Sequence, residues 1–302
     1  MRRDGSRIVP VIALLALALA AAEASPPPVE AELFGDGVVS TADFETHPAF
    51  TPDGKTLYFV KSTPQFTDWK IWVTERNAGG TWSPPKMAPF SGTYRDADPY
   101  VTADGKRLYF ISDRPVDGKP KEDMDIWVME RSKEGAWGTP KNLGAPVNSS
   151  GSEWLPRPAA NGTLYFGSDR PGGLGKTDLY RSKLVDGKYQ APENLGPAIN
   201  TAAEEYEPCI APDESFLIFM AAGRPDTGGG GDLYISYRKD GAWTPPQNLG
   251  PTVNRRGLDI GPYLSLDGKS FYWSSGRIVG GRNGMGDIYR IDLDILKKLA
   301  SH

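Results

Sequence analysis

The stretch DADPYVTADGKRLYFISDRP, residues 96–115, contains the unit from which most of the chain is built. An acidic residue stands three positions before a proline, Asp104-Gly105 follows, and the hydrophobic run Leu-Tyr-Phe leads into Ser-Asp-Arg-Pro. Asp-Gly favours a tight hairpin turn because both residues tolerate positive φ. The stretch therefore predicts two antiparallel strands joined by a hairpin.

The same unit occurs five times along the sequence. Its prolines are 51 to 57 residues apart, and the copies begin at Glu45–Pro48, Asp96–Pro99, Glu153–Pro156, Glu205–Pro208 and Asp259–Pro262. All but the fourth copy have Asp-Gly or Asn-Gly at the turn. A third hydrophobic run follows, and in the first four copies a Trp or Tyr then precedes a fourth strand. Four short strands recurring at a regular step are typical of the blades of a β-propeller.

The fifth copy lacks its fourth strand, because the residues after Asp292 contain no Trp or Asn-Leu-Gly element. The segment 33–41 near the other end resembles residues 143–150, which follow the third strand of the second copy. We therefore expect the N-terminal segment to supply the outer strand of the last blade. The predicted fold is an all-β, five-bladed propeller with four antiparallel strands per blade, closed by its N-terminal strand.

Several repeat motifs point to a known family: SDRP at 112–115, SDRPGG at 168–173, DLY at 178–180 and PENLG at 192–196. They resemble the TolB-like, WD40-like propeller repeat, close to the repeats found beside OmpA-type domains in envelope proteins. The resemblance covers about residues 31–294 and implies a propeller, although propellers have many functions. No OmpA-like segment follows in this sequence, and five copies are one fewer than the six blades usual in TolB.

The first 24 residues differ from the rest. Three arginines precede an apolar run of about 15 residues, which ends in small residues before a proline-rich stretch; this is typical of a secretory signal peptide and short of the roughly 20 residues that span a bilayer. We expect a signal peptide at 1–24, a linker at 25–30 and one propeller at 31–302. The mature chain is then periplasmic or secreted, with no transmembrane segment.

The net charge and the cysteine count bear on nucleic-acid binding and on disulfide formation. Removal of residues 1–24 changes the formal charge from −4 to about −5, which does not favour nucleic acid as a partner. Cys209 is the only cysteine, so an intrachain disulfide is excluded.

Rows of charged residues recur at fixed positions of the repeat. An acid stands three residues before each proline, and an arginine follows the second strand in four copies. We expect these arginines to form structural ion pairs that tie the loops of the blades, because guanidinium binds carboxylate in a fork. The acids are Glu45, Asp96, Glu153, Glu205 and Asp259, and the arginines are Arg114, Arg170, Arg224 and Arg277. A second row of acids opens the third strand at Asp125, Asp178, Asp232 and Asp287, and the first copy has Lys61 and Lys70 in place of both rows.

The residue just before each proline differs between copies. If the first strand lines the central channel, these residues ring its mouth. They are His47, Asp98, Leu155, Glu207 and Gly261. We take His47, Asp98 and Glu207 as candidate binding residues, together with Glu205 and Trp154. Phe66, Trp69 and Trp154 are candidates for stacking on sugars or packing on a protein. We predict no metal site or cofactor, although these carboxylates leave Ca²⁺ as an alternative.

The sequence offers little catalytic machinery. A Gly-x-Ser-x-Gly nucleophile motif is absent, and His47 is the only histidine besides His302, so neither a serine hydrolase nor a zinc enzyme is favoured. We predict a non-catalytic module that binds a protein or cell-envelope glycan on its acid- and arginine-rich face. The alternative is a glycoside-active propeller that uses the channel-mouth carboxylates; an arginine partner disfavours it, because it lowers a carboxyl pKa.

Overall fold

The computed structural model describes residues 31–63, 67–254, 257–276, 278–279, 282–283 and 286–299. The predicted signal peptide 1–24, the linker 25–30, Phe66 and Arg277 lie outside these ranges. Within them, no helix combines the length and apolar character needed to span a membrane.

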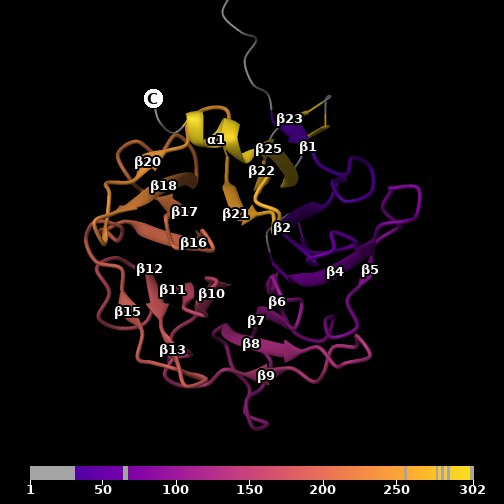
Figure 1. Cartoon of the computed structure of the whole chain (residues 1–302), viewed down its shortest axis with the longest axis horizontal. Helices are drawn as coiled ribbons and strands as arrows, with labels where there is room; N and C mark the ends of the chain where they lie inside the picture. Colours follow the sequence, from indigo (N-terminus) through magenta and orange to yellow (C-terminus); the bar gives the residue numbers. More distant parts are fainter. Residues whose placement is uncertain are drawn as a thin grey trace, which may run out of the picture.

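Five four-stranded antiparallel sheets surround a central axis, which confirms the predicted propeller (Figure 1). The innermost strands contact one another around the ring, and β2 contacts β21 to complete it. These innermost strands are β2 (Phe44–Phe50), β6 (Asp96–Val101), β10 (Glu153–Pro158), β16 (Glu204–Ile210) and β21 (Asp259–Leu264). The second strands are β3 (Thr56–Ser62), β7 (Arg107–Ser112), β11 (Leu164–Ser168), β17 (Phe216–Ala222) and β22 (Ser270–Ser275).

The third strands are β4 (Lys70–Glu75), β8 (Asp125–Glu130), β12 (Asp178–Ser182), β18 (Asp232–Lys239) and β25 (Asp287–Asp292). Each outer strand has only two residues: β5 (Lys86–Met87), β9 (Lys141–Asn142), β15 (Glu193–Asn194), β20 (Gln247–Asn248) and β1 (Glu32–Leu33). Shorter pieces complete the description: β13 (Leu184–Val185), β14 (Lys188–Tyr189), β19 (Ala242–Trp243), β23 (Ile278–Val279), β24 (Arg282–Asn283) and the helix α1 (Leu293–Leu299).

Stacking of neighbouring blades buries both faces of the second strands. The sequences of these strands are therefore continuous runs of hydrophobic residues, without alternating polar positions. In β7, Leu108 and Phe110 are fully buried and Tyr109 is 3% exposed. Leu108 and Phe110 pack in one cluster with residues of blade one, and Tyr109 packs in the next cluster with residues of blade three. The core is therefore a ring of interfaces between blades.

The N-terminal strand closes the ring as predicted. In β1, Glu32 and Leu33 pair antiparallel with Arg290 and Tyr289 of β25. Beyond β1, the backbone N–H of Phe34 donates to the carbonyl of Ile288 at 2.8 Å.

Residues after β1 continue the closure. Val39 is fully buried, and the hydroxyl of Ser40 accepts the backbone N–H of Ile288 at 3.0 Å. In blades two, three and four an asparagine side chain holds the corresponding third-strand residue. It accepts the backbone N–H of that residue and donates to its carbonyl. The asparagines are Asn148, Asn200 and Asn254.

Every innermost strand carries a β-bulge at its X-Pro pair. In β2 the register shifts between Thr46 and Ala49, and the equivalent shift occurs in the other four strands. A bulge suits proline, which has no N–H for the ladder. The residue before each proline is left-handed, with φ of 54° at His47, 56° at Asp98, 43° at Leu155, 57° at Glu207 and 63° at Gly261. Four non-glycine residues in this conformation mark the channel mouth as a strained ring.

The C-terminal helix α1 is not anticipated from the sequence. Leu296 is fully buried against the cluster between blades four and five, and the carboxylate of Asp292 accepts the backbone N–H of Asp294 at 2.8 Å. The three-residue spacing of Leu293 and Leu296 is the signal that could have indicated it.

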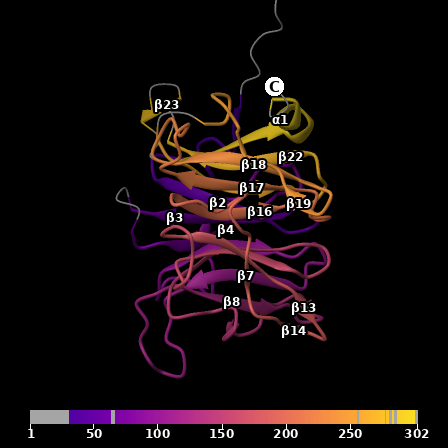
Figure 2. The same cartoon turned by 90° about the vertical axis from the view of Figure 1, so that its left-hand side faces the viewer.

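The strand ends define two opposite faces of the propeller (Figure 2). We call the acid face the one on which the first and third strands begin, and the turn face the one with the hairpin turns between first and second strands. Figure 2 shows β23 on the acid face and α1, β13 and β14 on the opposite, turn face.

We expect Val39→Ala to lower the free energy of unfolding by about 2 kcal/mol, because it removes buried methyl groups from the closing segment. Val185→Ala is the matched control, since Val185 is 48% exposed, and should change stability by less than about 0.5 kcal/mol. Equilibrium urea unfolding of both variants measures the difference; equal stabilities would show that the closing segment contributes little.

Candidate functional site

The repeated charges form ion pairs within their blades. Each arginine guanidinium also stacks on a second-strand phenylalanine, with 4.8 Å from Arg114 to Phe110 in blade two. The acids of these pairs are fully buried. The N–O distances are 2.6 Å for Arg114–Asp96, 3.1 Å for Arg170–Glu153 and 2.8 Å for Arg224–Glu205.

In blade one, Lys61 replaces the arginine and lies 3.2 Å from Glu45, and Lys70 pairs with Asp68 at 2.8 Å. In blade five Asp259 is buried, and its repeat partner Arg277 lies outside the described residues.

Buried hydrogen bonds tie the same acids to the preceding loops. Glu153 accepts the amide and hydroxyl of Ser149, and Glu205 accepts those of Thr201. Burial raises the pKa of Glu153 to about 7, although the Ser149 hydroxyl and the charge of Arg170 oppose this shift. The aspartate at the start of the third strand accepts a hydrogen bond from the side-chain amide of the asparagine in Asn-Leu-Gly. The N–O distances are 2.8 Å for Asn142–Asp125, 2.7 Å for Asn194–Asp178 and 2.8 Å for Asn248–Asp232.

Three of the predicted mouth residues meet at one imidazole. His47 Nε2 lies 3.0 Å from Glu207 Oε1 and 3.4 Å from Asp98 Oδ1, while Nδ1 lies 2.7 Å from the hydroxyl of Thr46. His47 and Asp98 are nearly fully buried, and the side chain of Glu207 is 12% exposed. The three side chains come from blades one, two and four, so this contact crosses the channel.

The second oxygen of each carboxylate holds a neighbouring blade. Asp98 Oδ2 accepts the backbone N–H of Leu155 at 2.8 Å, and Glu207 Oε2 accepts that of Gly261 at 2.6 Å. These N–H donors are available to the carboxylates because the bulge leaves the pre-proline residue out of the ladder pairing. All five innermost strands are thus connected at the mouth, either through His47 or through an amide.

A small cavity lies over this cluster. Its volume is about 40 Å³, and it is lined by His47, Val60, Trp69, Ala97, Asp98, Ile111, Trp154 and Glu207. Trp69 and Trp154 meet edge to face with ring centroids 6.1 Å apart. We call this cavity the mouth pocket. It brings together His47, Asp98, Glu207 and Trp154, whereas the fifth candidate, Glu205, lies in the ion pair with Arg224.

The electrostatics of the mouth pocket depend on burial and on the two acids. Burial lowers the pKa of His47, but the charges of Asp98 and Glu207 outweigh it and the pKa is raised above 6.5. Burial raises the pKa of Asp98, and the opposite charge of His47 counters this effect. The two carboxylates thus shift the His47 imidazole toward its protonated form.

Sequence reasoning missed Val60, Ala97 and Ile111, which form the apolar wall of the mouth pocket, and Arg157, which lies deeper in the channel. Arg157 follows its pre-proline residue by two positions. The equivalent residues in the other copies are Ala49, Tyr100, Cys209 and Tyr263. Arg157 is the one charged residue among these five equivalent positions, and this difference could have identified it from the sequence.

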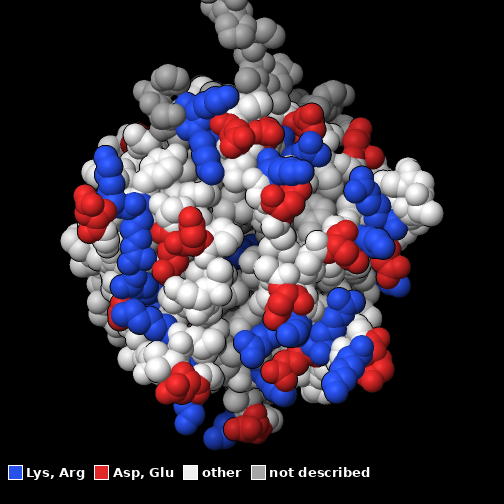
Figure 3. Space-filling model, in the orientation of Figure 1, with Lys and Arg blue, Asp and Glu red and all other residues white. Residues whose placement is uncertain are grey.

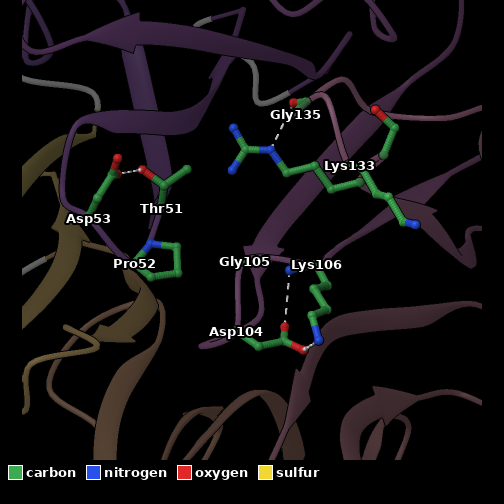
Figure 4. Close-up of a pocket in the computed structure, with 10 residues that line it drawn as sticks. Thr51, Pro52, Asp53, Asp104, Gly105, Lys106, Lys133 and Gly135 are labelled. Atoms are coloured by element: carbon green, nitrogen blue, oxygen red, sulfur yellow. Dashed lines mark hydrogen bonds and ion pairs between the residues drawn. The ribbon is translucent and has the colours of Figure 1, made fainter.

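Two other kinds of site, a metal site and a surface groove, have weaker support. Within the described ranges, no group of three or more His, Cys, Asp or Glu is placed to hold a metal ion. A groove of about 560 Å³ lies between the hairpin turns of blades one and two (Figure 4). There, Asp53 accepts the Thr51 hydroxyl at 2.6 Å, and Asp104 accepts the backbone N–H of Lys106 at 3.0 Å. Both carboxylates therefore accept hydrogen bonds within their own hairpin turns.

No family model matches the chain, and no curated protein sequence matches it either. Among solved structures, TolB from Acinetobacter baumannii is 18% identical with a TM-score of 0.49, over 82% of this chain and 54% of that one. The chain therefore spans about half the length of that protein. An α-L-arabinofuranosidase from Podospora anserina is 14% identical with a TM-score of 0.46, over 85% and 92%. A periplasmic gluconolactonase from Pseudomonas aeruginosa is 13% identical with a TM-score of 0.42, over 76% and 64%.

We expect Asp98→Ala to lower the free energy of unfolding by at least about 2 kcal/mol, because it leaves the buried Leu155 amide without its acceptor and removes one of the two carboxylates beside His47. Asp43→Ala is the control, since that carboxylate is 63% exposed in its pair with Lys61 and should matter by less than about 0.5 kcal/mol. Chemical denaturation compares the two; an unchanged Asp98→Ala stability would contradict the proposed tie between blades.

The protonation of His47 predicts how stability depends on pH. Because folding raises its pKa above 6.5, the imidazolium stabilises the fold fully below that pH and the contribution is lost as pH rises through the raised value. NMR titration should give a His47 midpoint above 6.5, with His302→Gln used to assign the signal. Wild type should also lose more stability than His47→Gln between about pH 6 and 9. A midpoint below 6.5 would refute the charged cluster.

Proposed function

We propose that this chain is a non-catalytic binding protein of the periplasm or extracellular space, which takes a protein or cell-envelope glycan at its acid face. The mouth pocket is the proposed centre of that contact. It combines half-buried tryptophans with a polar floor, and such amphipathic rings serve as anchors in recognition of both kinds of partner.

One observation supports binding over hydrolysis: both mouth carboxylates are fully engaged. Each accepts a backbone amide of a neighbouring blade with one oxygen and contacts His47 with the other. A glycosidase needs one carboxyl group that reaches the glycosidic oxygen and another that faces water or the anomeric carbon. Asp98, though its pKa is raised, is only 4% exposed and has neither oxygen free for this task.

The size of the mouth pocket limits what can enter it. About 40 Å³ admits a single small group, such as a side-chain end or a sugar substituent. The remainder of a partner would contact the surrounding loops. Arg95 lies over Trp69 at 5.8 Å and pairs with Asp113 at 2.7 Å, and Tyr94 beside it is 37% exposed. These residues extend the aromatic surface outward from the pocket.

Secretion is part of the proposal and depends on the predicted signal peptide at 1–24. An exported propeller would encounter envelope proteins and glycans, which are the partners that the acid face is proposed to bind. Expression of the full chain with N-terminal sequencing of the mature product tests the predicted cleavage after Ala24.

Substitution of the pocket should abolish binding without unfolding the protein. We expect Trp69→Ala and Glu207→Gln to weaken binding of a partner identified from envelope extract, or of a glycan from an array, by at least about tenfold, as for central interface residues. Trp243→Ala is the matched control, because β19 lies on the turn face. Titration calorimetry measures affinity, and circular dichroism checks folding.

The enzyme alternative has its own readout. Envelope polysaccharides are incubated with the wild type and assayed for new reducing ends. Release that disappears in Glu207→Gln would overturn the non-catalytic proposal, whereas equal binding by Trp69→Ala and wild type would move the binding site away from the mouth pocket.

A further inference from the structure

A second ring of side chains lies below the mouth, two residues after each pre-proline position. Arg157 is its only charged member, and it is the only Lys or Arg in the five innermost strands. Its guanidinium lies 4.9 Å from the ring of Tyr100 and 6.0 Å from that of Tyr263, whose centroids are 6.4 Å apart. Side chains from blades two, three and five therefore meet around one buried cation.

The hydrogen-bond donors of Arg157 are not satisfied by the described residues. The residue is 2% exposed, and Nη1 donates to the carbonyls of Pro156 at 3.2 Å and Pro99 at 3.4 Å. Nε and Nη2 are buried and have no hydrogen-bond partner among the described residues. No carboxylate in that part of the chain lies within 4.0 Å of it, unlike the carboxylates paired with Arg114, Arg170 and Arg224.

Neighbouring groups do not supply the missing negative charge. Burial raises the pKa of Tyr100 to about 12 and that of Cys209 to about 11, so both stay protonated beside the guanidinium. Asp98 acts on Arg157 through space, but its oxygens already hold Leu155 and His47. A buried charge with unmet donors is costly unless a partner completes it.

One residue of the second ring, Tyr100, also lines a cavity on the turn face. A cavity of about 440 Å³ on this face includes Tyr100, Arg107, Pro158, Ile210 and Leu266 in its lining, so Tyr100 is shared between the cavity and the contact with Arg157. Figure 3 views the molecule from this face and shows a basic side chain at the bottom of the central hollow.

We propose that Arg157 is a binding site for a small monovalent anion, a halide or a simple carboxylate, which enters the channel from the turn face and accepts hydrogen bonds from Nε and Nη2. The walls of Tyr100 and Tyr263 limit its size, and their aromatic faces flank the guanidinium rather than compete for its donors. The site is separate in space from the mouth pocket, which opens on the acid face.

Bromide is the direct probe. Crystals of the wild-type protein grown with sodium bromide should show an anomalous peak within hydrogen-bonding distance of Nε and Nη2, and added sodium formate should displace it. Refined water at that position, with no anomalous signal, would overturn the proposal without any variant being needed.

Thermal unfolding tests the site in solution. Ionic strength is held constant with sodium gluconate, whose anion is much larger than bromide or formate. Bromide or formate at about 100 times Kd should then raise Tm by about 5 °C. Arg157→Met should lose this rise, whereas Arg107→Met, which removes an exposed arginine of the same cavity, should keep it. An equal rise in both variants would place the anion elsewhere. If Arg157→Met does not fold, the wild-type bromide crystals and the Arg107→Met titration still decide the matter.

Discussion

Closure of the ring is the constraint on which the rest of this structure depends. Each innermost strand packs against the next around the axis, β2 contacts β21 to complete the inner ring, and β1 completes the outer edge of the last blade by pairing with β25. The closing contacts join residues from opposite ends of the sequence, such as Glu32 with Arg290 and Ser40 with Ile288. Its loop-closure entropy is large, and burial of Val39 and Phe34 with its aromatic neighbours offsets that cost.

Within the closed ring, repeated and non-repeated residues do different work. Residues that recur in most copies hold loops to strands, as the pairs Arg170–Glu153 and Asn194–Asp178 show. Residues at the pre-proline position, which differ from copy to copy, meet across the channel instead. Non-identical side chains there break the fivefold symmetry, and an asymmetric ring is what allows a single polar cluster to form around His47.

The fold could be predicted from the sequence because each copy carries its own turn and strand signals, and because residues 33–41 resemble a fragment missing at the other end. The site could be predicted only in part. Position within the repeat grouped His47, Asp98 and Glu207, but the direction of their carboxylates depends on a bulge that exposes the amides of Leu155 and Gly261. Arg157 was overlooked because ordinary strand alternation does not predict which residue faces the channel after a bulge.

The two ends of the channel are coupled by charge. Arg157 lowers the pKa of His47, and it also acts on Asp98, so the cation of the second ring and the cluster at the mouth share one low-dielectric axis. An anion bound at Arg157 would cancel part of that repulsion and raise the pKa of His47 further. By linkage, protonation of His47 would strengthen anion binding to the same extent. Occupancy of the proposed anion site and protonation of His47 would therefore be linked through this electrostatic interaction.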